Sequence, residues 1–111
     1  MRELTLKTTR VTLKINGKEY TSKMSDAEII GMVNEKQRRF SELMNREYTI
    51  DEVLAAVKDA TDSIDAILGD GAVAAISNGD AVSVRDAIRW LTAIANAVTE
   101  EYVARLVEQY G

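Results

Sequence analysis

Two glycine stops close together constrain the fold of this chain more than any other feature. A strongly amphipathic pattern runs into Leu68 and ends at Gly69, and a short apolar turn over residues 72–76 ends at Asn78-Gly79. Glycine adopts positive φ without steric cost, so it commonly terminates helices. Residues 64–80 therefore predict an elbow between two long helices, in which Gly69 is left-handed and the next glycine keeps the turn tight. The structural glycines of this elbow are Gly69, Gly71 and Gly79.

Three long helices are predicted around the elbow, and each begins with a capping signal. Ser25-Asp-Ala-Glu28 and Thr49-Ile-Asp-Glu52 match the capping box, in which the first and fourth residues satisfy each other's backbone N–H groups. Ser83 opens the last helix. We expect long helices over residues 25–45, 49–68 and 83–109, and a short elbow helix over residues 72–76.

Each long helix carries an apolar stripe, which predicts its buried face. The stripe of the first helix comprises Ile30, Val33, Gln37, Phe40, Leu43 and Met44, flanked by Ile29 and Met32. The stripe of the second helix comprises Ile50, Val53, Leu54, Val57, Ala60, Ile64, Ile67 and Leu68. The main stripe of the last helix comprises Val84, Ala87, Ile88, Leu91, Ile94, Ala95, Val98, Tyr102 and Leu106.

An Asn16-Gly17 turn between two alternating runs predicts an N-terminal β-hairpin. Apolar and polar residues alternate up to Ile15, and a second run begins at Lys18. Asn-Gly favours a two-residue type I′ turn, which pairs Ile15 with Lys18 and Leu13 with Tyr20. Further upstream, Leu4 and Leu6 fall on the opposite side of the strand alternation from Val11. A bulge or break near residues 8–9 is therefore expected.

These elements predict an α+β fold. An isolated hairpin is marginal in water, so this one must dock on the helices or join a larger sheet. The chain of 111 residues is long enough to bury a core as a single domain, residues 1–111. We predict an N-terminal β-hairpin (residues 1–24) packed on a bundle of three long helices with a short elbow helix (residues 25–111).

The composition excludes several classes of function. The chain has no histidine and no cysteine, which removes the commonest general base and the commonest zinc ligands. Asp59, Asp62 and Asp65 share one side of the second helix, and we interpret them as solvated charges rather than metal ligands. We therefore predict no catalytic residue, no metal and no cofactor. No apolar run reaches the roughly 20 residues that span a bilayer, and the N-terminus lacks the apolar core of a signal peptide.

Charge is distributed unevenly along the chain. The net charge is −4, which argues against general nucleic-acid binding. Residues 1–24 hold six Lys or Arg against two Glu, whereas residues 49–80 hold seven acids against one Lys. Opposite charges could bring together the ends of neighbouring subunits, or a subunit and a partner. We favour the alternative that both segments are solvated faces.

The last helix carries a second apolar strip, away from its main stripe. This strip comprises Trp90, Ala93, Ala97 and Ala104. A helix that is apolar on two sides is covered on two sides. One interpretation is an interface with a second copy or a protein partner, in which Trp90 is the anchor. The other is that Trp90 lies under the β-hairpin and fills the core. Both remain open from the sequence.

The order of these elements resembles a known family. The run Ile15-Asn-Gly-Lys-Glu-Tyr20 in an N-terminal hairpin, and Ile67-Leu-Gly-Asp-Gly-Ala72 before a long C-terminal helix, are similar to the small tail assembly chaperones of long-tailed phages and prophages of Gram-positive bacteria. The resemblance implies a non-enzymatic protein of the bacterial host cytoplasm. Such a protein would coat the tape-measure protein, recruit tail-tube subunits and be absent from the finished virion.

The sequence thus favours a protein-binding factor, most readily a phage tail assembly chaperone and a homo-oligomer. Its expected partners are the tape-measure and tail-tube proteins, without nucleic acid or membrane. One alternative is another small phage structural or regulatory interaction protein. A less favoured alternative is a small enzyme that uses only Asp, Glu, Lys, Ser or Tyr, which would need a convergent polar cluster in a pocket.

Overall fold

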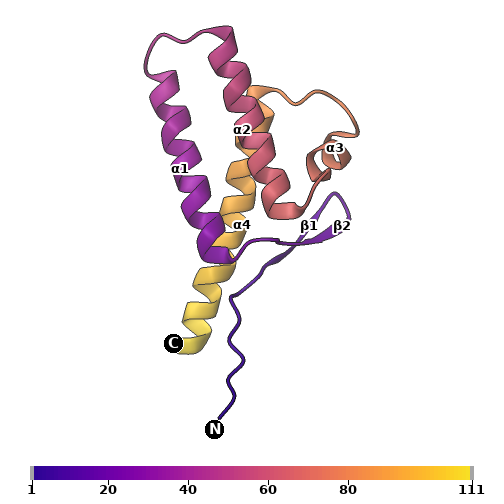
Figure 1. Ribbon diagram of the computed structural model, residues 1–111, viewed down its shortest axis with the longest axis vertical. Coiled ribbons are helices and arrows are strands. Elements are labelled where there is room, and N and C mark those ends of the chain that lie inside the picture. The colour runs from indigo at the N-terminus through magenta and orange to yellow at the C-terminus, as the bar shows by residue number, and fades with distance from the viewer. Residues whose placement is uncertain (1, 111) are drawn as a thin grey trace.

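The structure is a computed structural model that describes the backbone of residues 2–110 and the side chains of residues 2–108. Its elements follow the order β1 (Thr12–Ile15), β2 (Lys18–Thr21), α1 (Asp26–Met44), α2 (Ile50–Leu68), α3 (Ala72–Ser77) and α4 (Val84–Tyr110) (Figure 1). This order confirms the predicted α+β fold, with an N-terminal hairpin, three long helices and a short elbow helix.

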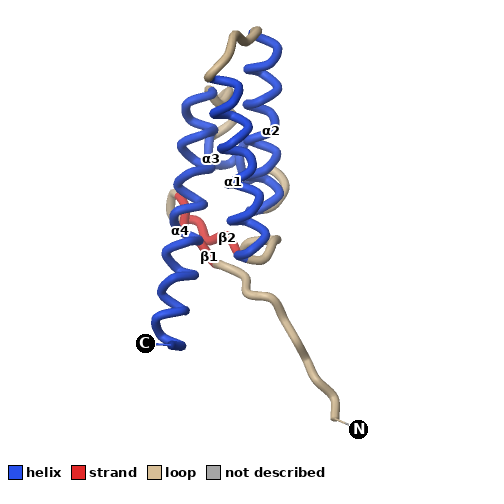
Figure 2. The backbone as a smooth tube through the Cα atoms, turned by 90° about the vertical axis from the view of Figure 1, so that its left-hand side faces the viewer, coloured by secondary structure: helices blue, strands red, loops and turns tan. Residues whose placement is uncertain are grey.

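The three long helices form an elongated bundle organised around α4. This helix packs against both α1 and α2, which touch each other much less. The hairpin and α3 lie on one side of the bundle, beside the C-terminal half of α2 (Figure 1). The last part of α4 and the residues before β1 extend from the same end of the bundle (Figure 2). These two extensions give the molecule its length of 58 Å against a width of 31 Å.

The hydrophobic core lies between α2 and α4 and is closed by α1, α3 and the hairpin. At its centre, Ile64 and Ile67 of α2 meet Leu91 and Val98 of α4, and each of these side chains exposes 1% or less of its surface. The other buried apolar residues are Val11, Tyr20, Ile29, Val33, Leu43, Ala60, Leu68, Ala72, Val73, Ala87 and Ile94. The core is therefore built from every element of the fold except the β1 strand, whose apolar residues are half-buried against it.

Two residues of the predicted α2 stripe are exposed. Ile50 and Leu54 expose 76% and 61% of their surface, although Leu68, on the same flank of the helix, exposes only 4%. The difference arises because the elbow places α3 over the end of α2, whereas no described element covers that flank near its start. The prediction of a stripe buried along the whole helix is therefore wrong over the first turns.

The β-hairpin has the predicted register. Ile15 pairs with Lys18 and Leu13 with Tyr20. The two turn residues, Asn16-Gly17, have φ values of 50° and 83°, as a type I′ turn requires. Both apolar residues of β1 pack against the core, so the hairpin is docked rather than isolated.

The segment before β1 is an extended arm and not part of the sheet. No described residue before Thr12 lies in a strand, so a strand through the leucines at positions 4 and 6 does not form. The carbonyl of Thr9 accepts a hydrogen bond from the N–H of Asp26 at 3.0 Å, and the Arg10 guanidinium donates to the Lys23 carbonyl at 2.6 Å. These bonds hold the base of the arm to the start of α1.

The two predicted capping boxes differ in completeness. Thr49 and Glu52 form the full reciprocal box at the start of α2. At α1, the Glu28 N–H donates to Ser25 Oγ at 3.3 Å, but the Ser25 hydroxyl donates to the Glu28 carboxylate at 2.9 Å. The Glu28 carboxylate thus binds the capping side chain rather than the capping backbone.

The elbow contains the predicted positive-φ glycines, with one correction. Gly71 and Gly79 are left-handed, each with φ of 82°. Gly69 is not left-handed: its φ of 118° and ψ of 153° place it in an extended region that is essentially restricted to glycine. A hydrogen bond from the Val73 N–H to the Asp65 carboxylate, 2.9 Å long, ties the start of α3 back to α2.

Candidate partner-binding surfaces

The second strip of α4 borders a groove beside the hairpin, here called the β1–α4 groove. Its volume is about 370 Å³. Its lining residues are Leu13, Lys14, Ile15, Asn16, Ile64, Ile76, Trp90, Ala93 and Ile94. Trp90 and Ala93 are thus brought together with the hairpin, whereas the other two members of the strip, Ala97 and Ala104, lie outside the groove. Ala97 is half-buried and Ala104 is exposed.

Both interpretations of Trp90 correspond to a feature of this groove. The indole is half-buried and packs against the hydrophobic core, as expected for a residue beside the hairpin. It also lines the wall of a groove that has no occupant among the described residues, as expected for an interface residue. A large aromatic side chain that is half-buried beside an apolar groove is well placed to contribute to protein binding.

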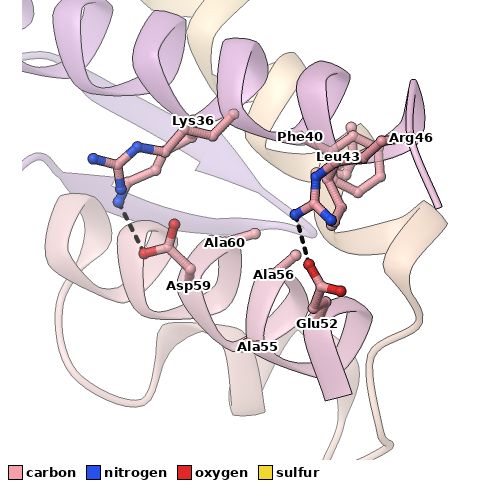
Figure 3. Close-up of a pocket in the computed structure, with 11 residues that line it drawn as sticks. Lys36, Phe40, Leu43, Arg46, Glu52, Ala55, Ala56, Asp59 and Ala60 are labelled. Carbon is pink, nitrogen blue, oxygen red and sulfur yellow. Dashed lines mark hydrogen bonds and ion pairs between the residues drawn. The ribbon is translucent and has the colours of Figure 1, made fainter. Parts of the chain in front are cut away.

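A second hollow, of about 320 Å³, lies between α1 and α2 (Figure 3). Charged pairs cross it at two points: Lys36 Nζ lies 2.8 Å from Asp59 Oδ1, and the Arg46 guanidinium pairs with Glu52. Hydrogen bonds from the Arg46 guanidinium and then from the Thr49 backbone N–H hold the pKa of Glu52 below its usual value. The first pair therefore joins α1 to α2, and the second joins the loop after α1 to the start of α2.

The three aspartates on one side of α2 have separate partners. Asp59 pairs with Lys36 across the hollow, Asp62 pairs with Lys58 on the same helix, and Asp65 binds the start of α3. Among the described residues, no group of three or more acidic, histidine or cysteine side chains is placed to hold a metal ion. The sequence interpretation as solvated charges therefore needs refinement for Asp65, which has a structural role.

The last part of α4 exposes a row of large apolar side chains, here called the tail stripe. It comprises Tyr102, Val103, Leu106 and Val107, which expose between 39% and 63% of their surface. The contact of Arg105 with Asp26, at 3.4 Å, marks the point where α4 passes the first residue of α1. The prediction that the main stripe of α4 stays buried as far as Tyr102 and Leu106 is therefore wrong, because the bundle ends before the helix does.

Helix length was the signal that could have revealed the tail stripe from the sequence. The structure has 27 residues in α4 but only 19 in α1 and 19 in α2. At 1.5 Å per residue, a difference of this size leaves about 12 Å of α4 without a neighbour of matching length. The predicted helix bounds already contained this mismatch.

No protein-family model matches the chain, and neither a curated protein nor a solved structure matches it. None of the helices in the described part of the chain is both long and apolar enough to cross a membrane.

Proposed function

We propose that this chain is a non-enzymatic protein-binding factor, specifically a tail assembly chaperone of a long-tailed phage that acts in the bacterial host cytoplasm. Its partners in this proposal are the tape-measure protein and the tail-tube protein. The choice of family rests on the resemblance carried by residues 15–20 and 67–72. The assignment to protein binding is supported by one structural observation, the exposed tail stripe of α4.

The chemistry of the tail stripe favours a helical protein partner. Contiguous exposed apolar side chains with a polar rim mark protein-binding sites more often than ordinary surface. Residues 99–108 contain three Glu and one Arg, so the rim of the stripe is acidic. Apolar side chains on a helix bind a partner helix through residues at matching spacing, and opposite charges fix their register. We therefore expect a partner helix whose apolar stripe is flanked by Lys or Arg.

Co-expression tests this proposed function. A gene for a very large helical protein just downstream identifies the candidate tape-measure partner, and the tail-tube candidate is encoded in the same neighbourhood. We expect the chain to co-purify with at least one of these proteins through size-exclusion chromatography, because binding a partner removes the exposed apolar side chains of the tail stripe from water. If both candidates are expressed in folded form and neither co-purifies, the proposed function is wrong.

A further inference from the structure

The N-terminal arm, residues 2–8, has the pattern of a strand but no partner strand. Leu4 and Leu6 expose 70% and 86% of their surface and alternate with polar residues. No hydrogen bond or ion pair between described residues involves the arm. The arm extends away from the bundle and from α4 (Figure 2). An alternating apolar strand of this kind is suited to pairing with the edge of a sheet.

The outer edge of β1 offers the hydrogen-bonding groups that such a strand needs. The N–H of Ser22 donates to the carbonyl of Val11 at 2.8 Å, so these two residues form a hydrogen-bonded pair of the hairpin. Bonded and non-bonded pairs alternate along an antiparallel ladder. Thr12 and Lys14 are therefore non-bonded positions, and their backbone N–H and C=O groups point away from β2. The sheet has only two strands, so no described strand meets these groups.

The β1–α4 groove runs along this same edge. Four consecutive residues, 13–16, line it, and no residue of β2 does. Side chains alternate between the two faces of a strand, so a hollow lined by consecutive residues follows the edge of the strand rather than one face. The far wall is apolar and includes Trp90, Ala93 and Ile76. A strand paired with β1 would place every second side chain against this wall.

The arm cannot reach the β1 edge of its own chain in the antiparallel direction. That path needs a reversal between the arm and Thr12, but the intervening residues are fixed. The carbonyl of Thr9 accepts from the Asp26 N–H, Arg10 binds the Lys23 carbonyl, and the Val11 N–H donates to Ser22 Oγ at 3.1 Å. With three successive residues held, there is no free segment in which to form a turn. The arm that pairs with this edge must come from a second copy.

We propose that the arm of one copy adds to the outer edge of β1 in a second copy as an antiparallel third strand. Leu4 then lies in the β1–α4 groove, whereas Leu6 lies beyond the end of the groove, beside Val11. In the register that places Leu4 opposite Leu13, Glu3 lies opposite Lys14 and Thr5 opposite Thr12. Opposite charges facing each other across strands stabilise a register, and this register brings together the acidic residue of the arm and the lysine that lines the groove.

Two aspartate variants in the arm test whether the arm of one copy pairs with β1 of a second copy. The measured quantity is the molecular mass of the full chain in solution. Light scattering of the unaltered protein should give a species larger than the 12.3 kDa monomer. Leu4→Asp should return it to the monomer, because the charge would enter the apolar groove beside Leu13. Thr5→Asp adds the same charge to the outer face of the strand and should leave the mass unchanged. A monomeric unaltered protein, or a Leu4→Asp variant of unchanged mass, overturns the proposal.

Disulfide trapping tests the register, since the natural chain has no cysteine. A Thr5→Cys copy is mixed with a Thr12→Cys copy and oxidised, and a covalent dimer of the two is expected because paired strand positions meet disulfide geometry. The control is Thr21→Cys, which replaces the residue directly opposite Thr12 on β2. It should form little dimer with Thr5→Cys. Equal trapping at both positions, or none at Thr12→Cys, contradicts the proposal. Neither assay requires a partner protein, so its result is independent of the proposed function.

Discussion

Ile64→Ala is expected to lower the free energy of unfolding by about 3–4 kcal/mol, the largest effect of any single truncation predicted here. The side chain of Ile64 is completely buried in the core that α2 forms with α4. Its truncation loses buried apolar surface and leaves a cavity, because the close-packed side chains around it cannot move in to fill the space. Urea denaturation followed by circular dichroism measures the change as a lower midpoint.

The matched control is Leu54→Ala on the same helix. Leu54 exposes 61% of its surface, so its truncation should cost less than about 1 kcal/mol. Similar losses for the two variants would show that the start of α2 is buried as deeply as its end, contrary to the structure.

Gly69→Val is expected to destabilise the protein by about 2–3 kcal/mol, because the backbone of Gly69 is in a region that valine avoids. Its φ is 118° and its ψ is 153°. A Cβ at this position would lie 3.4 Å from Lys23 Cε, which is an ordinary contact with the end of a flexible side chain. The cost therefore comes from the backbone conformation rather than from a clash. Thermal unfolding of the purified variant measures it as a lower Tm.

Gly31→Val provides the control for this substitution. Gly31 lies within α1, and apart from its chain neighbours and the nearby backbone of α1 itself, a Cβ built on it has no heavy atom within 4 Å. Valine is slightly better than glycine inside a helix, so this variant should be unchanged or stabilised by a few tenths of a kcal/mol. If Gly69→Val unfolds at the same temperature as the unaltered protein, the elbow does not require positive φ at this position.

Local signals made most of the fold predictable. The Asn16-Gly17 turn determined the hairpin register, and the box from Thr49 to Glu52 determined where α2 begins, because each depends on a few adjacent residues. The conformation of Gly69 was less predictable. Sequence indicated positive φ, but the choice between left-handed and extended backbone depends on how α3 folds back onto α2.

The candidate surfaces were harder to predict because they depend on which helix covers which. Periodicity placed Tyr102 and Leu106 in a buried stripe, although a periodic pattern does not say where the neighbouring helix ends. The same limit applies to Ile50, which lies on an apolar flank that no described element covers. Conversely, the sequence identified Trp90 as a residue with two possible roles, and the structure places it at the core and at an open groove together.

The tail stripe of α4 is the surface on which the proposed function depends, and a binding measurement tests it most directly. Isothermal titration compares the affinity of three forms of the chain for its co-purified partner. The first is unaltered, the second carries Val103→Glu with Val107→Glu, and the third carries Asn34→Glu with Ser41→Glu. The last pair adds the same charge at exposed positions of α1, away from the stripe.

We expect the Val103→Glu, Val107→Glu variant to remain folded and to bind the partner at least roughly tenfold more weakly, because two carboxylates would be desolvated in the contact. The α1 control should keep the affinity of the unaltered chain. Equal partner affinity in all three forms would contradict protein binding through the tail stripe.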